Sequence, residues 1–101
     1  MTSKYTSLKA FYPFYLSQHQ NTVCRRLHFV GSLLGLTCLA AAFILQAPYY
    51  ILLGLVLGYL FAWIGHFVFE KNKPATFQYP LYSFVCDLLI FRDILLRRLP
   101  W

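Results

Sequence analysis

Residues 27–69 have the sequence LHFVGSLLGLTCLAAAFILQAPYYILLGLVLGYLFAWIGHFVF, and these 43 residues contain no Lys, Arg, Asp or Glu. A membrane-spanning helix needs about 20 apolar residues, so the stretch is long enough for two spans. Its middle is interrupted only by Gln46-Ala47-Pro48, and a proline favours the first turn of a new helix. The sequence therefore predicts an antiparallel hairpin of two spanning helices, about Asn21 to Leu45 and Pro48 to Phe69.

The composition of the whole chain also favours a membrane protein. The 101 residues form a single integral membrane domain (1–101) in this interpretation, with 59% hydrophobic and only 12% charged residues and a mean hydropathy of +0.56. Soluble domains carry about 25% charged residues, so a disordered chain, a secreted disulfide scaffold and most soluble enzymes are excluded. The net charge of +6 does not indicate a nucleic-acid partner, because the cations cluster at the ends of apolar segments. The expected partner is the lipid bilayer.

The distribution of charge predicts the orientation of the hairpin. Its two ends carry Arg25, Arg26, Lys71 and Lys73, whereas its turn is uncharged. Basic residues mark the cytoplasmic side of membrane proteins, so both termini are expected in the cytoplasm.

Two shorter segments flank the hairpin. Apolar and aromatic residues recur at helical spacing before it, and they predict an interfacial amphipathic helix that starts near Pro13, with Tyr12 and Tyr15 at the headgroup level. After the hairpin, Pro80 to Phe91 is apolar except for Asp87. This segment is short for a span, which favours an interfacial or re-entrant helix; a third short span is the alternative. The predicted fold class is an all-α membrane protein.

The placement of two histidines in the hairpin suggests a metal site. His28 lies 19 residues before Ala47 and His66 lies 19 residues after it, which predicts the same depth on the two helices. Packed helix axes lie about 8–10 Å apart, so two imidazoles that face each other can bind one ion. Glu70 follows His66 by four residues and is expected on the same helical face.

The remaining histidine, His19, reaches this site only if the first span begins after it. In one continuous helix His19 and His28 would point in opposite directions. Asn21 is a favoured helix N-cap, so the helix is expected to begin there, and His19 can then fold back over its end. Three imidazoles and a carboxylate suit Fe, Zn or Mn. The cysteines show no paired spacing, and none is expected among the ligands.

Structural interpretations of the same residues remain open. The histidines can form hydrogen bonds between helices, and Glu70 can pair with Lys71 or Lys73. Asp87 can fix the tautomer of a ligand histidine or pair with an arginine. The patterns Gly31/Gly35 and Gly54/Gly58 can pack the hairpin or form a homodimer.

Two stretches of the chain resemble the signature of a known family. These stretches are His19-Gln20-Asn21 with His28 and Gly31, and residues 65–75, which have the pattern G-H-x-x-x-E-K-x-K-P-A. The chain, over about residues 12–96, resembles the small membrane proteins long catalogued as a domain of unknown function, whose fungal member is the 2-hydroxy fatty acid dioxygenase of fatty-acid α-oxidation. Thr22 and Cys24 stand where this family often has proline and a second asparagine.

The resemblance implies an activity and a site. It implies an Fe(II)-dependent dioxygenase that uses O₂ to shorten a 2-hydroxy fatty acid by one carbon, in the endoplasmic reticulum or a bacterial inner membrane. It also implies that four residues form the catalytic metal site: His19, His28, His66 and Glu70. Arg25, Arg26, Lys71 and Lys73 are expected to attract the acid carboxylate, with Asn21 and Asp87 supporting the ligands. The alternative is a non-enzymatic membrane module that binds lipid or a partner protein, with its basic residues on anionic lipid.

Overall fold

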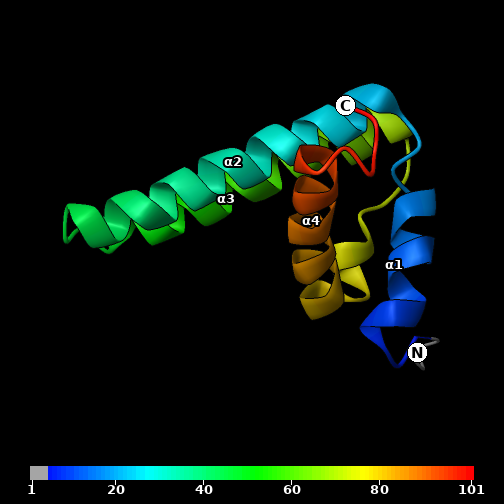
Figure 1. Cartoon of the computed structure of the whole chain (residues 1–101), viewed down its shortest axis with the longest axis horizontal. Helices are drawn as coiled ribbons and strands as arrows, with labels where there is room; N and C mark the ends of the chain where they lie inside the picture. The colour runs from blue at the N-terminus through cyan, green and yellow to red at the C-terminus, as the bar shows by residue number, and fades with distance from the viewer. Residues whose placement is uncertain (1–4) are drawn as a thin grey trace.

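The computed structural model describes residues 5–101 as an all-helical chain. The helices α2 and α3 form a long antiparallel hairpin, and α1 and α4 lie below the end of the hairpin that is remote from its turn (Figure 1). In chain order the elements are α1 (Leu8–Ser17), α2 (Thr22–Ile44), α3 (Tyr49–Ile64), the π-helical turn η1 (Gly65–Glu70), the 3₁₀ turn η2 (Ala75–Phe77) and α4 (Pro80–Leu95).

The hairpin has the predicted boundaries. The Asn21 side chain caps α2 by accepting hydrogen bonds from the backbone N–H groups of Val23 and Cys24, and Pro48 precedes α3. The segments Thr22–Ile44 and Tyr49–Glu70 are long and apolar enough to cross a membrane, and only 17% and 22% of their most apolar windows are buried within the protein. Within residues 5–101 these are the two helices long and apolar enough to cross a membrane, and α4 has 16 residues.

Glycines allow the two helices of the hairpin to approach closely. Gly31 faces Gly58, and Gly35 faces Gly54. A Cβ atom added at Gly54 would lie 2.9 Å from the Cβ of Cys38 and 3.0 Å from the Gly35 carbonyl oxygen. The prediction that these glycines pack the hairpin is therefore confirmed.

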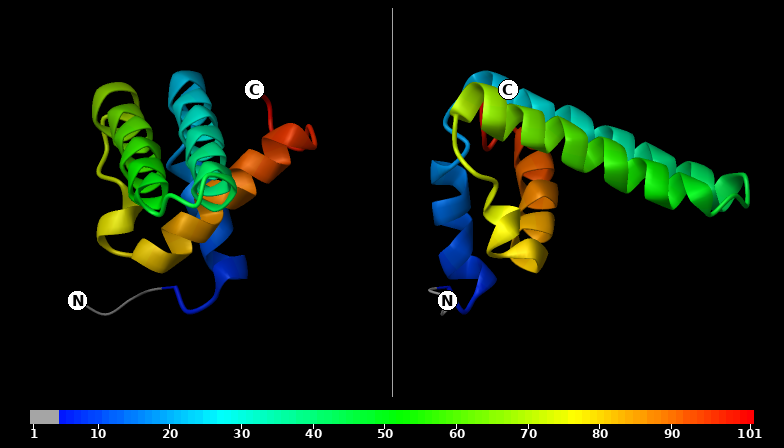
Figure 2. Two further views of the ribbon diagram at one scale, coloured as in Figure 1. Left: turned by 90° about the vertical axis from the view of Figure 1, so that its left-hand side faces the viewer. Right: turned by 180° about the vertical axis from the view of Figure 1, so that it is seen from behind.

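The buried apolar core lies outside the hairpin, between α1 and α4. It contains Phe11, Tyr15, Tyr79, Cys86, Ile90 and Ile94. The rings of Phe11 and Tyr79 lie 4.8 Å apart, a distance typical of favourable aromatic pairs. Turning the molecule shows α4 crossing below the hairpin, with α1 beside α4 (Figure 2).

The structure corrects two predictions for α1. The helix begins at Leu8, after a Ser7 cap, and contains Pro13 in its interior, so the expected start at Pro13 is wrong. The loss of one backbone hydrogen bond is offset by the burial of Phe11 and Tyr15 on either side of the proline. Tyr15 is therefore a core residue and not a headgroup anchor.

The carboxylate of Asp93, near the C-terminal end of α4, links α4 to α1 by a hydrogen bond. The Tyr12 hydroxyl donates a hydrogen bond to Asp93 Oδ2 (2.7 Å), and Arg92 and Arg98 lie 2.8 and 3.7 Å from Asp93 Oδ1. Burial acts to raise the pKa of Asp93, but the hydrogen bonds from Tyr12 and Arg92 and the two positive charges outweigh it and lower the pKa.

Candidate metal centre

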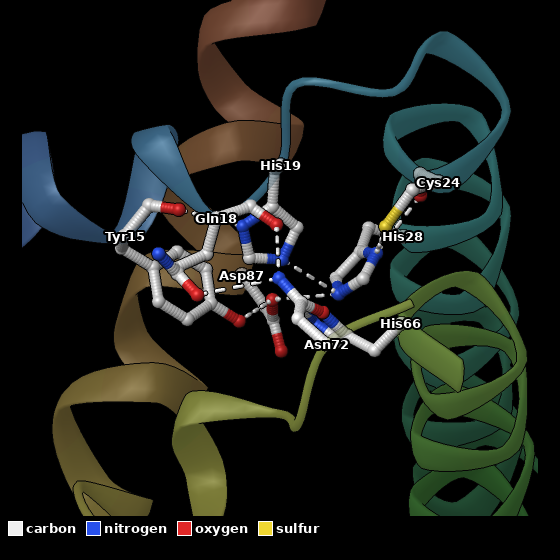
Figure 3. A network of polar contacts seen from close by, with 8 residues as sticks. All are labelled: Tyr15, Gln18, His19, Cys24, His28, His66, Asn72 and Asp87. Carbon is white, nitrogen blue, oxygen red and sulfur yellow. Dashed lines mark hydrogen bonds and ion pairs between the residues drawn. The ribbon is translucent and has the colours of Figure 1, made fainter. Parts of the chain in front are cut away.

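Three buried imidazole rings meet where the hairpin joins α1. His19 follows α1, His28 lies on α2 and His66 lies on η1, and each side chain is at most 2% exposed. The ring centroids are 4.3 Å apart for His19 and His28, 4.5 Å for His19 and His66, and 4.9 Å for His28 and His66 (Figure 3). The prediction that His19 folds back over the start of α2 is confirmed.

The sequence predicts the same depth for His28 and His66, but His66 lies somewhat further from the turn. Gly31 lies against Gly58 and Phe61, so His28 is level with positions 61–64 and His66 lies two to five residues beyond that level. The rings still meet because a helical side chain leans towards the N-terminus of its own helix. The helices are antiparallel, so the two side chains lean towards each other.

Hydrogen bonds fix the tautomer of two of the histidines through backbone carbonyls. His19 Nδ1 lies 2.6 Å from the Tyr15 carbonyl oxygen, and His28 Nδ1 lies 2.9 Å from the Cys24 carbonyl oxygen. A carbonyl oxygen only accepts, so each Nδ1 carries the proton and donates it. Each Nε2 then holds a free lone pair.

Asn72 fixes the tautomer of the third histidine. Its Nδ2 donates to the backbone carbonyl oxygen of Gln18 (3.3 Å), which determines the orientation of the amide. Its Oδ1 therefore faces His66 Nδ1, at 2.8 Å, and accepts a hydrogen bond from it. Sequence analysis missed Asn72 and Gln18, because only the fold brings these two amides together.

The three free Nε2 atoms fit a metal cation. His19 Nε2 and His28 Nε2 lie only 3.0 Å apart. With both protons on Nδ1, the two lone pairs repel each other unless a cation lies between them. Two ligands at right angles, each about 2.1 Å from an ion, are separated by about this distance. Burial also lowers the pKa of His19 well below its ordinary value, which favours the neutral form that binds metal.

Cys24 is a neighbour of this centre that sequence analysis did not expect. The group able to hold a metal ion comprises His19, Cys24, His28 and His66, whose ligand atoms all lie within 4.8 Å of one another. The Cys24 Sγ atom lies 3.6 Å from His28 Nδ1, on the side of the ring away from His19 (Figure 3). The spacing of Cys24 and His28, four residues apart on one helix, is the signal that could have revealed it.

Asp87 of α4 borders the centre. Its Oδ1 lies 3.7 Å from His28 Nε2 and accepts a hydrogen bond from the Tyr15 hydroxyl. Burial raises the pKa of Asp87 to about 7, although the hydrogen bond from Tyr15 opposes this shift. Arg92 of α4 and Arg98, which follows α4, pair with Asp93 instead, so the expected alternative of an arginine pair at Asp87 is not what the structure shows.

Glu70 has a partner that sequence analysis did not expect. Residues 65–70 form a π-helical turn at the end of the hairpin. Glu70 Oε1 accepts a hydrogen bond from the backbone N–H of Asn21. Glu70 is not in the group of potential ligands found among residues 5–101, and its role as a metal ligand stays a prediction.

The four predicted substrate-binding cations lie at different distances from the centre. Arg25 is nearest: its Nη1 donates to the carbonyl oxygen of His19 (3.4 Å), and its Nε is buried without a hydrogen-bond partner. Arg26 lies over the Trp101 ring at 5.2 Å, and Lys71 and Lys73 are exposed.

A groove of about 360 Å³ begins at the metal centre and follows the hairpin towards its turn. His28 and Asp87 line it at one end, Leu39 and Ile51 line it at the other, and α4 forms one wall.

The fold and this site define a class of protein: a small all-helical protein in which an apolar hairpin and two packed helices enclose three histidines able to hold a metal ion. The family model described as 2-hydroxy-palmitic acid dioxygenase Mpo1-like matches residues 5–99, and the chain belongs to this family. No curated protein and no solved structure matches the chain.

Proposed function

We propose that the protein is an Fe(II)-dependent dioxygenase that shortens 2-hydroxy fatty acids by one carbon. The observation that carries this proposal is the set of three Nδ1-protonated histidines whose free Nε2 atoms share one buried site, in a chain of a family named for this activity. His19, His28 and His66 hold the iron, a donor set that suits a non-haem iron centre with open positions.

The overall reaction is balanced without an external reductant. One 2-hydroxy acid and one O₂ give an acid shorter by one carbon, one CO₂ and one water. The bond between the carboxyl carbon and the hydroxyl-bearing carbon breaks, and the acid supplies the four electrons that reduce O₂. Bound iron supplies the activation of O₂, and the protein supplies binding and orientation.

The residues around the centre bind the polar head of the acid in this proposal. The buried Arg25 Nε lacks an acceptor, and a substrate carboxylate provides one. Arg26, Lys71 and Lys73 attract the anion to this end of the hairpin. Asp87, held by the Tyr15 hydroxyl beside His28, accepts a hydrogen bond from the 2-hydroxyl group.

The same proposal places the hairpin across a membrane, with both termini and the metal centre on the cytoplasmic side. Its 23-residue helix α2 is about 34 Å long, enough to cross a hydrocarbon core of about 30 Å. An Ala47→Cys variant should react with an impermeant thiol reagent only from the outer side. Labelling only from the cytoplasmic side would refute this orientation.

The activity is tested with purified protein loaded with Fe(II) under controlled O₂. O₂ consumption is expected only with a 2-hydroxy fatty acid, together with stoichiometric release of the shortened acid; the 3-hydroxy isomer is the matched negative substrate. His28→Ala should abolish both signals. Iron-loaded protein that turns over no 2-hydroxy acid of any chain length would reject the proposal and favour the non-enzymatic membrane module.

A further inference from the structure

The groove that begins at the metal centre changes in polarity along its length. Its polar lining residues, His28, Ser32, Tyr59 and Asp87, lie in the part nearest the centre. Gly31 faces Gly58, so positions 35–39 of α2 and 51–55 of α3 form the other part, towards the turn. The lining residues of this second part are glycine, leucine and isoleucine only.

Glycine backbone forms part of the floor of the groove. Gly35 and Gly54 both line it, at a point where the two helices are in close contact. Phe84 and Leu88 of α4 form an apolar wall over the half near the centre. The result is a narrow apolar path with a polar end that touches the histidine cluster.

The length of the groove can be compared with that of a ligand. From His28 to Leu39 the helix advances about 16 Å. An extended chain advances about 1.2 Å per bond, so the groove accommodates roughly a dozen carbons in line. A polar head with one long unbranched alkyl chain matches both the polarity and the length.

We propose that this groove binds the alkyl chain of the 2-hydroxy fatty acid, with the polar head at His28 and Asp87 and the chain end at Leu39 and Ile51. The identity of the head group rests on the proposed function. In this arrangement the far end of the groove sets the longest chain that the protein accepts.

The proposal is tested by photolabelling the metal-free full-length protein in phosphatidylcholine nanodiscs. The probes are 2-hydroxy fatty acids of increasing length with a diazirine at the chain end. The long probe should label Leu39 and Ile51, and a probe about four carbons shorter should label positions about one turn nearer the centre. Labelling that does not move with chain length would overturn the proposal.

Two tryptophan variants make the test specific. Leu36→Trp fills the middle of the groove and should lower labelling beyond it about 5- to 150-fold, the range expected for overpacking. Leu33→Trp, at a 46% exposed position that does not line the groove, is the matched control and should label like the parent. Equal labelling of the two variants would refute the assignment.

Two further measurements identify which kind of molecule binds in the groove. A phosphatidylcholine with the same chain-end diazirine should not label the groove, and excess unlabelled 2-hydroxy acid should remove the signal. Efficient labelling by the phospholipid would show a lipid site instead. The experiment needs neither iron nor turnover, so groove labelling without catalysis would reject only the proposed activity, and catalysis without groove labelling would reject only the chain site.

Discussion

Asn72→Ala is expected to weaken metal binding although Asn72 is not itself a ligand. The side chain accepts the Nδ1 proton of His66 (2.8 Å) and donates to the Gln18 carbonyl oxygen (3.3 Å). Without it, His66 can take the other tautomer and turn its Nε2 proton towards the ion. Gln18 directly precedes His19, so the substitution removes both the hydrogen bond that orients His66 and the one that holds the backbone next to His19.

The expected size of this effect follows from what such supporting hydrogen bonds contribute in other metal sites. Loss of a hydrogen-bond partner behind one ligand histidine lowers metal affinity about 10–100-fold, which is about 1.4–2.7 kcal/mol. Because the Asn72 amide supports both His66 and the segment before His19, we expect a loss at the upper end of this range.

Two companion variants separate the causes. Asn72→Asp keeps an oxygen that accepts the His66 proton but loses the donor to Gln18, so it should recover part of the affinity. Gln20→Ala removes an exposed amide one residue beyond His19 and should bind metal like the parent.

The assay is anaerobic competition for Fe(II) or Co(II) against a chromophoric chelator, with circular dichroism to confirm that each variant is folded. A folded Asn72→Ala variant that binds metal as tightly as the parent would refute the argument from tautomers.

Three further predictions concern the fold. Gly54→Val should destabilise the hairpin by about 1–3 kcal/mol, because its Cβ would lie 2.9 Å from the Cβ of Cys38. Gly58→Ala should be tolerated, because its Cβ would lie 3.6 Å from the nearest atom. Equal melting temperatures for the two variants would contradict this prediction. Phe11→Ala should cost about 3–5 kcal/mol in denaturant unfolding, because Phe11 is fully buried, and a loss below this range would show that the α1–α4 core is not stabilising. Asp93→Asn should be less stable than the parent at neutral pH, because hydrogen bonds and cations lower the pKa of Asp93 in spite of burial. This stabilisation is present above the unfolded pKa of about 3.9 and is lost as the pH falls through the lower folded pKa. The melting temperatures of the two proteins should therefore converge in acid.

The sequence was sufficient to predict the hairpin because its signals are strong and local. An uncharged stretch long enough for two helices, one proline at the turn and an asparagine cap are each readable within a few residues. The spacing also predicted that His28 and His66 meet, although His66 lies two to five residues further from the turn than the level of His28. Residue counting ignores that helical side chains lean towards the N-terminus of their helix, and this lean brings the two rings together in spite of the offset.

The supports of the site could not be predicted in the same way. Asp87 meets Tyr15 only because α4 packs against α1, and the chain offers no periodic signal for that pairing. Glu70 accepts the N–H of Asn21, 49 residues earlier in the chain, and no local spacing predicts that contact. Long-range packing is outside the reach of residue spacing.

The two motif stretches are joined by a pair of hydrogen-bonded ties on either side of His19. Glu70, four residues after His66, accepts the N–H of Asn21, and Asn72 binds the Gln18 carbonyl oxygen. The segment from Gln18 to Asn21 is therefore held at both ends by the chain that follows His66. His19 lies outside every helix, where a side chain is free to move, and these ties place its ring 4.5 Å from that of His66. Glu70 and Asn72, both within the second motif stretch, are thus hydrogen-bonded to the two sides of the histidine of the first stretch.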